Sequence, residues 1–157
     1  MGCLIGIDYG EKRTGLAYTD PNKIIATGLK SILTKDVIKF LGAYFEKVEV
    51  EMLIIGKPIQ KDGKPSNVEE KIKKFIKNIK TNFPEIKIDR YDERYTSKIA
   101  RNFIKEFGMK KKIRHDKGII DKISATLILQ SYLEFKKINY DFTHTRLWLT
   151  SFKKSSN

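Results

Sequence analysis

The sequence has a single cysteine and no long apolar run. Cys3 has no second cysteine to pair with, so no internal disulfide can form and nothing points to an oxidising compartment. No apolar run approaches the roughly 20 residues of a membrane-spanning helix. The first residues lack the basic region and the apolar stretch of a secretory signal peptide. We therefore expect a cytoplasmic protein that does not enter a membrane.

Acidic residues are also few compared with basic ones. Lys and Arg total 32 residues against 19 Asp and Glu, which gives a formal net charge of +13. Proteins this basic often bind polyanions, because Lys and Arg displace counterions from phosphate groups. Most of the basic residues are Lys, however, and a genome biased toward A/T-rich codons would produce the same excess. The charge favours a nucleic-acid partner, with codon bias as the alternative explanation.

The 157 residues, 40% of them hydrophobic, suit one folded domain, which we place at residues 1–138. Five segments resemble strands: 3–9, 15–19, 24–32, 50–56 and 86–91. Helical patterns cover 35–47, with Thr34 as N-cap, the segment from a capping box at Ser66 to Pro84, 97–107 and 118–136. Residues 139–157 show no motif or periodicity, and we expect a flexible C-terminal extension there.

The connections between these segments predict the fold class. Short turns, with Gly10 and Gly15 as turn residues, join the first three strands and favour an antiparallel meander. Helices join the first, fourth and fifth strands, which favours parallel neighbours with right-handed crossovers. The predicted fold is α/β, a mixed five-stranded sheet with helices on both faces.

Three acidic residues lie where such a fold would bring side chains together. Asp8 ends the first strand, Glu93 follows the fifth strand, and Asp121 lies in the first turns of the last predicted helix. Each has an ordinary alternative: Asp8 as a turn residue, Glu93 as an ion-pair partner of Arg90 or Arg94, and Asp121 as a charge favourable to the helix dipole. Three carboxylates without His or Cys form a hard oxygen site that suits Mg²⁺ or Mn²⁺.

Such a site has a use in a basic protein. One or two divalent cations held by carboxylates can activate water and stabilise the leaving oxygen of a phosphodiester. Lys and Arg would hold the nucleic acid while the acids and their cations cut it. A nuclease is therefore the favoured interpretation. An actin-like ATP-binding fold is the other enzyme class that a D-x-G motif permits, but 157 residues are too few for its two lobes.

Four motifs together resemble the YqgF family, also called RuvX, over residues 3–136. They are GIDYGEKRTGLA, IIGKPIQKDGKPSN, YDERYTS and KGIIDKISATLILQSYL. The resemblance implies an RNase H-like fold, with Asp8, Glu93 and Asp121 as the catalytic, metal-binding acids. It also implies that the substrate path is lined by Lys12, Arg13, Lys57, Arg94 and Thr96, although many members have Leu at the position of Lys57.

The resemblance implies two substrates. One is the 5′ end of precursor 16S rRNA, which we favour, with ribosomal particles as further partners. The other is a four-way Holliday junction, which a resolvase normally cuts as a dimer. The sequence shows no obvious apolar dimer patch, so a monomer or weak dimer is expected. A noncatalytic nucleic-acid-binding module is the third interpretation.

Overall fold

The computed structural model describes residues 2–93 and 116–154, with residues 138–154 described as helical backbone alone. The strands are β1 (Cys3–Asp8), β2 (Arg13–Thr19), β3 (Ala26–Leu33), β4 (Val50–Lys57) and β5 (Lys87–Asp92). The helices are α1 (Val37–Phe45), which follows a 3-10 turn (Thr34–Asp36), α2 (Glu69–Asn82) and α5 (Lys117–Lys154). In the parts of the chain that the structure describes, no helix is long and apolar enough to cross a bilayer.

The five strands form one sheet in the order β3-β2-β1-β4-β5. β1 pairs antiparallel with β2, and β2 pairs antiparallel with β3. β1 pairs parallel with β4, and β4 pairs parallel with β5. The mixed sheet predicted from the connections is therefore confirmed. β1 lies at its centre, and the carboxyl ends of β1, β4 and β5 meet at one edge.

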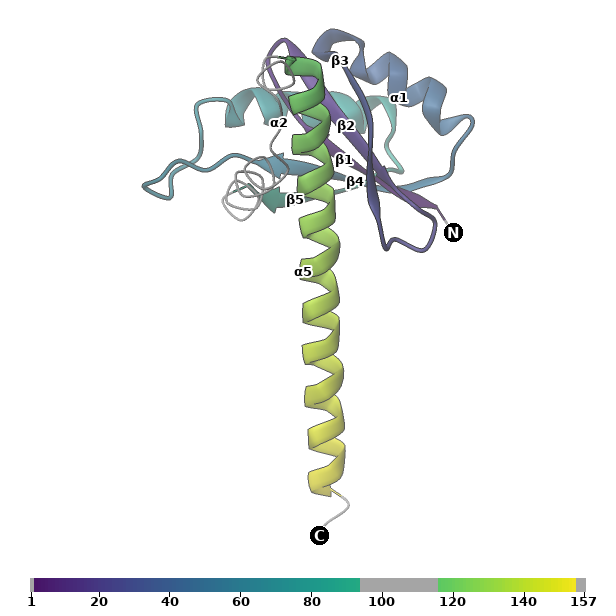
Figure 1. Cartoon of the computed structure of the whole chain (residues 1–157), viewed down its shortest axis with the longest axis vertical. Helices are drawn as coiled ribbons and strands as arrows, with labels where there is room; N and C mark the ends of the chain where they lie inside the picture. Colours follow the sequence, from purple (N-terminus) through teal and green to yellow (C-terminus); the bar gives the residue numbers. More distant parts are fainter. Residues whose placement is uncertain (1, 94–115, 155–157) are drawn as a thin grey trace.

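Side chains of alternate strand residues build a core on each face of the sheet. Ile5 and Ile7 of β1 pack with residues of α1 and α2, including Leu41 and Ile72. Leu4 of the same strand lies in the second core, to which α5 contributes Ala125, Ile128, Leu129 and Tyr132. Figure 1 shows α1 and α2 on one face and α5 running across the other. Burial of both faces explains why β1 and β4 are almost entirely apolar.

Most predicted element ends differ from the structure by one or two residues, and three predicted roles of residues at these ends are wrong. β2 begins at Arg13, so Gly15 lies within the strand and is not a turn residue. α2 begins at Glu69, and its N-cap residue Val68 makes no side-chain capping bond, so the predicted capping box is wrong. Thr34 is likewise no cap for α1, because its hydroxyl donates to the carbonyl oxygen of Gly10.

The last helix is longer than predicted. α5 continues to Lys154, well beyond the expected end near residue 136, and its second half projects from the body (Figure 1). The sequence contains no Gly or Pro between Gly118 and the C-terminus, so nothing in it breaks the helix. Flexibility of residues 139–157 stays a prediction. The predicted helix 97–107 lies outside the described residues.

Candidate active site

Asp8 is a half-buried acid at the end of the central strand. Its pKa is raised from 3.8 to about 7. Burial is the main cause, because a charge loses hydration there, and repulsion from Glu93 and Asp121 adds to it. Glu93 and Asp121, which lie 85 and 113 residues from Asp8 in the chain, are thus close enough in space to raise its pKa.

Gly15 brings Asp121 to Asp8. The two residues Asp8 and Gly15 are directly paired across β1 and β2. A Cβ atom on Gly15 would overlap the backbone carbonyl of Asp121, so the missing side chain lets the first turns of α5 lie directly on the sheet. The backbone of Asp121 is thereby placed over β2, the strand next to the one that carries Asp8. Glycine is needed here for close approach, not for a turn.

Gly56 does the same for Glu93 on the other side of β1. It follows Ile55, which pairs with Ile7, so Gly56 lies beside Asp8 on β4. A Cβ atom on Gly56 would overlap Oε1 of Glu93 and lie 2.8 Å from Cδ1 of Ile128. Two glycines therefore flank Asp8, and each makes room for one of the other two acids.

Glu93 lies directly after β5, where its backbone N–H donates to the Lys57 carbonyl over 3.1 Å. Burial raises the pKa of Glu93, although the positive charge of Arg90 opposes that rise. The guanidinium of Arg90 makes its bidentate contact with Glu69, at 2.8 and 3.0 Å. It also donates to the carbonyls of Ile55 and Gly56 on β4. Arg90 thus links α2 with β4 and β5, and its charge lies close enough to Glu93 to affect the pKa of that acid.

Asp121 is held by two residues of neighbouring strands. The hydroxyl of Ser31, on β3, donates to Asp121 Oδ2 over 2.9 Å. The guanidinium Nε of Arg13, on β2, lies 3.6 Å from the same oxygen. Asp121 therefore has specific polar partners, which a charge that only favours the helix dipole would not need.

The donor chemistry of these acids fits Mg²⁺ or Mn²⁺, which prefer carboxylate oxygens. Within residues 2–93 and 116–137, no group of three or more acids, histidines or cysteines is arranged to hold a metal ion. The raised pKa of Asp8 shows electrostatic repulsion, which acts over longer distances than coordination. A bound cation would relieve this repulsion.

The predicted nucleic-acid residues are placed in part. Lys12 is exposed in the turn between β1 and β2, and Lys57 is half-buried at the end of β4. The turn is held by Thr34, whose backbone N–H donates to the Lys12 carbonyl over 3.0 Å. Arg94 and Thr96 lie outside the described residues.

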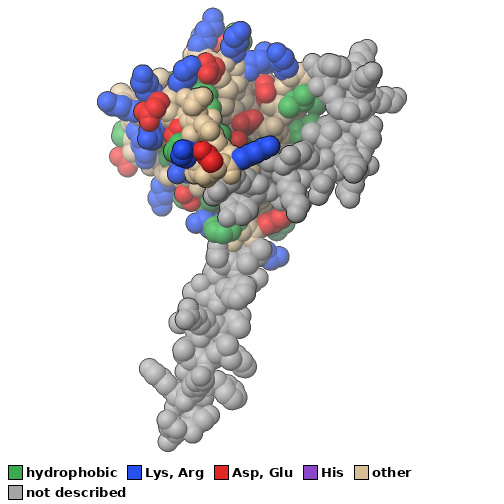
Figure 2. All heavy atoms as spheres, turned by 90° about the vertical axis from the view of Figure 1, so that its left-hand side faces the viewer, with side chains coloured by type: hydrophobic (Ala, Val, Ile, Leu, Met, Phe, Trp, Pro, Cys, Tyr) green, Lys and Arg blue, Asp and Glu red, His purple; other side chains and the backbone are tan. Residues whose placement is uncertain are grey.

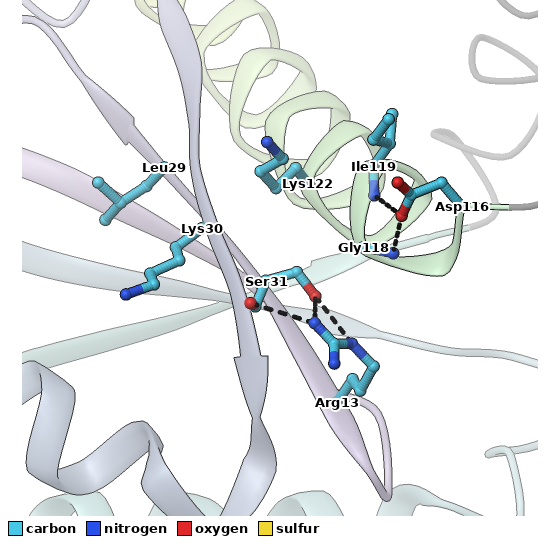
Figure 3. Close-up of a pocket in the computed structure, with 8 residues that line it drawn as sticks. All are labelled: Arg13, Leu29, Lys30, Ser31, Asp116, Gly118, Ile119 and Lys122. Atoms are coloured by element: carbon cyan, nitrogen blue, oxygen red, sulfur yellow. Dashed lines mark hydrogen bonds between the residues drawn. The ribbon is translucent and has the colours of Figure 1, made fainter. Parts of the chain in front are cut away.

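Arg13 is exposed at the rim of two hollows beside Asp121. The first, of about 260 Å³, is drawn in Figure 3 and is lined by Arg13, Leu29, Lys30, Ser31, Asp116, Gly118, Ile119 and Lys122. The second, of about 430 Å³, is lined by Lys12, Arg13, Leu33, Lys117, Ile120 and Asp121. Asp121 thus borders the second hollow.

Sequence reasoning missed four residues of this region: Ser31, Gly56, Glu69 and Arg90. Ser31 lies in a segment with no special pattern, so no sequence signal marked it. Arg90 had been considered only as a partner of Glu93, and Glu69 only as part of a capping box. Their ion pair joins residues that are 21 positions apart, and a one-dimensional pattern does not indicate it.

The sequence was compared with known proteins. The sequence model of a family described as "RuvX: Holliday junction resolvase" matches residues 2–135. A protein of Flavobacterium psychrophilum named "Putative pre-16S rRNA nuclease" is 48% identical over 136 residues, which cover 87% of this chain and 99% of the relative. A protein of the same name from Bacteroides thetaiotaomicron is 43% identical over 137 residues, with coverages of 87% and 99%.

Among solved structures, one titled "T. thermophilus RuvC in complex with Holliday junction substrate" is similar to this chain. The matched region covers 82% of this chain and 92% of the RuvC chain, with a TM-score of 0.48 and 14% sequence identity.

Proposed function

Since this chain belongs to the RuvX family, we propose that it is a Mg²⁺- or Mn²⁺-dependent endonuclease that hydrolyses phosphodiester bonds. We propose Asp8, Glu93 and Asp121 as its catalytic and metal-binding acids. The observation that carries the proposal is geometric: Gly15 and Gly56 flank Asp8, and each lets one of the other two acids approach it. The raised pKa of Asp8, caused mainly by burial and also by both other acids, agrees with this arrangement. Carboxylates kept this close in a largely buried place are costly for the fold, which is typical of functional sites.

The parts of the chain have separate tasks in this proposal. Asp8, on a strand buried on both faces, provides a fixed carboxylate, and Glu93 and Asp121 approach it over Gly56 and Gly15. The three acids would hold one or two cations. A bound cation supplies Lewis acidity toward the phosphodiester and its attacking water. Lys12, Arg13 and Lys57, with Arg94 and Thr96, would hold the nucleic-acid backbone at this edge.

A nucleic-acid substrate also suits the surface. The net charge is +13, and Figure 2 shows Lys and Arg side chains over much of the described part of one face, with acids among them. Counterion release from phosphates would therefore contribute strongly to binding. We propose the cytoplasm, where rRNA is processed, as the place of action.

For the substrate we favour the 5′ end of precursor 16S rRNA, in ribosome biogenesis. The names of the relatives that are 43% and 48% identical support this choice. The family description supports a second candidate, resolution of Holliday junctions in recombination or repair. Ribosomal particles would be partners only in the first case, and a symmetric dimer would be required only in the second.

A competition assay distinguishes the two substrates. The purified protein is given a precursor rRNA 5′ fragment and a four-way DNA junction at equal concentration, in physiological salt and Mn²⁺. Physiological salt matters because nonspecific phosphate binding dominates when salt is low. We expect preferential cleavage of the rRNA fragment. Selective cleavage of the junction would overturn the rRNA assignment and leave the nuclease proposal intact.

Substitution of Asp8 tests the site itself. Asp8→Asn should abolish Mg²⁺-dependent cleavage while the protein stays folded. Asp36→Asn is the matched control, because Asp36 is an exposed acid next to α1 and should leave cleavage unchanged. If the wild type binds the nucleic acids but cleaves neither of them, the noncatalytic interpretation would replace the nuclease proposal.

A further inference from the structure

Ser31 occupies a special place between the candidate site and the edge of the sheet. It pairs with Gly15 across β2 and β3, and Gly15 pairs with Asp8 across β1 and β2. The three residues therefore form one cross-strand row. Because Gly15 has no side chain, the start of α5 lies over the middle of this row, and Asp121 can reach the hydroxyl of Ser31.

The hydrogen bonds at Ser31 define the direction of its hydroxyl proton. Nε and Nη2 of Arg13 both donate to the Ser31 oxygen, at 3.3 and 3.1 Å (Figure 3). Nη2 also donates to the Ser31 carbonyl over 3.3 Å. With its lone pairs occupied by Arg13, the hydroxyl has one proton left to give, and Asp121 Oδ2 accepts it over 2.9 Å. Arg13 thereby makes Ser31 a dedicated donor to the carboxylate.

These contacts engage only one oxygen of Asp121. Among the described residues, hydrogen bonds and ion pairs to this carboxylate all reach Oδ2. The bond to Ser31 thereby restrains the orientation of the carboxylate. Carboxylates that bind metals are commonly oriented in this way by a hydrogen-bond partner outside the coordination sphere.

We propose that Ser31 is a positioning residue for Asp121, whose hydrogen bond holds the carboxylate in the orientation in which it would share a divalent cation with Asp8. This inference rests on the proposed function, and it assigns to the edge strand β3 a direct part in the site. Arg13 then has two tasks, because it orients the hydroxyl of Ser31 and, being 41% exposed, still presents its guanidinium to solvent.

The competing explanation is purely structural, since Ser31 also ties β3 to α5. Gln130 provides a matched control for this explanation. Its side chain makes the same kind of tie between α5 and the start of β3, accepting from Ala26 N–H over 2.9 Å and donating to the Ile24 carbonyl over 3.4 Å. It lies at the far end of the strand from Asp121. Loss of either tie should lower the unfolding midpoint, but only Ser31 should affect a cation.

The experiment measures the dissociation constant of Mn²⁺ alone, without nucleic acid, for the full chain and for Ser31→Ala, Ser31→Thr and Gln130→Ala. We expect Ser31→Ala to weaken Mn²⁺ binding about 10-fold or more, the usual effect of removing such a partner. Ser31→Thr keeps the hydroxyl and should restore binding to near the wild-type value. Gln130→Ala should bind Mn²⁺ as the wild type does, although its unfolding midpoint falls.

The outcomes separate this inference from the proposed function. If the wild type binds Mn²⁺, Asp8→Asn loses it, and Ser31→Ala binds as tightly as the wild type, the positioning role is overturned and the metal site stands. Equal weakening in Ser31→Ala and Gln130→Ala would also overturn the role, since a structural tie would then suffice. If the wild type binds no Mn²⁺ at all, both the inference and the proposed metal site fail.

Discussion

The protonation of Asp8 is strongly linked to folding. In the unfolded chain its pKa returns to about 3.8, whereas in the fold it is about 7. The folded protein therefore binds this proton more tightly than the unfolded chain does. Between these two values, stability falls as the pH rises, because the folded state must hold a poorly hydrated charge near two others. Well above pH 7, the destabilisation caused by the charge of Asp8 has reached its full value.

Asp8→Asn should remove this loss. In a metal chelator at pH 8, we expect the free energy of unfolding of the variant to exceed that of the wild type by about 2–4 kcal/mol, given about 1.4 kcal/mol per pKa unit. The difference should shrink to less than about 1 kcal/mol at pH 4, because the carboxyl is then protonated in the folded state and only about half ionised in the unfolded chain. Urea unfolding at pH 4, 6 and 8 measures it. Equal stabilities at pH 8 would contradict the electrostatic account of the site.

Gly56 offers a test of how the acids are spaced. In Gly56→Ala the new methyl group would meet Oε1 of Glu93 and Cδ1 of Ile128, both of which are ends of side chains that can move. We expect a folded protein, destabilised by about 1–2 kcal/mol as in other overpacked sites. Because Glu93 must turn away from Asp8, Mn²⁺-dependent cleavage should fall about 100-fold, the effect of a small misplacement of reacting groups.

Gly42→Ala is the matched control for Gly56→Ala. Gly42 lies in α1, and a Cβ atom there would make only ordinary contacts with the ring of Phe83, at 3.7 and 3.8 Å. This variant should cleave normally and gain about 0.5–1 kcal/mol, because alanine favours the helix. If Gly56→Ala cleaves as well as Gly42→Ala, then Glu93 is not required at its observed position.

At the scale of elements, a mostly buried ion pair connects α2 to the carboxyl edge of the sheet. Glu69 at the start of α2 and Arg90 on β5 form a bidentate salt bridge with side chains that are 6% and 23% exposed. The bond to Arg90 is the main reason that the pKa of Glu69 is lowered. Its stabilisation is therefore present above the unfolded pKa of about 4.5 and is lost as the pH falls below it.

Removal of one partner should be much worse than removal of an exposed pair. Arg90→Met leaves the Glu69 carboxylate in a mostly buried place without its cation, and we expect a loss of about 3 kcal/mol, as for other broken buried pairs. Lys73→Met breaks the exposed pair with Glu70 and should cost less than about 1 kcal/mol. Chemical denaturation at pH 7 compares the two. Similar small losses in both would show that the buried pair does not secure α2.

The sequence predicted element types well because each depends on local periodicity and on the length of its connections. The strands, their pairing and the helices on both faces of the sheet follow from such patterns, and the structure confirms them. Element ends were predicted less well. The capping box at Ser66 failed because the Glu69 side chain is engaged by Arg90, a partner that only the folded sheet brings close.

The site was predictable to the same extent. Asp8, Glu93 and Asp121 could be proposed from the sequence, because parallel strands bring their carboxyl ends to one edge. The residues that hold these acids in place could not be proposed from the sequence. Gly15 and Gly56 matter through the backbone and side-chain atoms that approach them, and Ser31 through a bond to a residue 90 positions away. Such contacts depend on register and packing, which residue patterns do not encode one by one.

At the scale of the whole molecule, α5 has two halves with different surroundings. Its first half packs on the sheet, and its described contacts reach from Asp121 at the site to Lys136, which lies 3.7 Å from Asp89 of β5. Its second half continues beyond the body as helical backbone (Figure 1). The fold of residues 1–138 should therefore not depend on residues 139–157.

A chain that ends at residue 138 tests this division. It keeps Ala125, Leu129 and Tyr132 in the core that α5 forms with the sheet. We expect its free energy of unfolding to lie within about 0.5 kcal/mol of the full chain, since no described core contact is lost. Mn²⁺ affinity should be unchanged for the same reason. Urea unfolding and Mn²⁺ titration of both chains measure this.

A second truncation supplies the contrast. A chain that ends at Thr126 lacks Ile128, Leu129 and Tyr132, all of which are buried, and should not fold, because one face of the sheet then loses most of its cover. If the chain ending at residue 138 also failed to fold, the projecting half of α5 would have to be a required part of the domain. If this chain folded but lost rRNA cleavage, residues 139–157 would contribute to substrate binding. The three acids would then lie at one end of a longer nucleic-acid-binding surface.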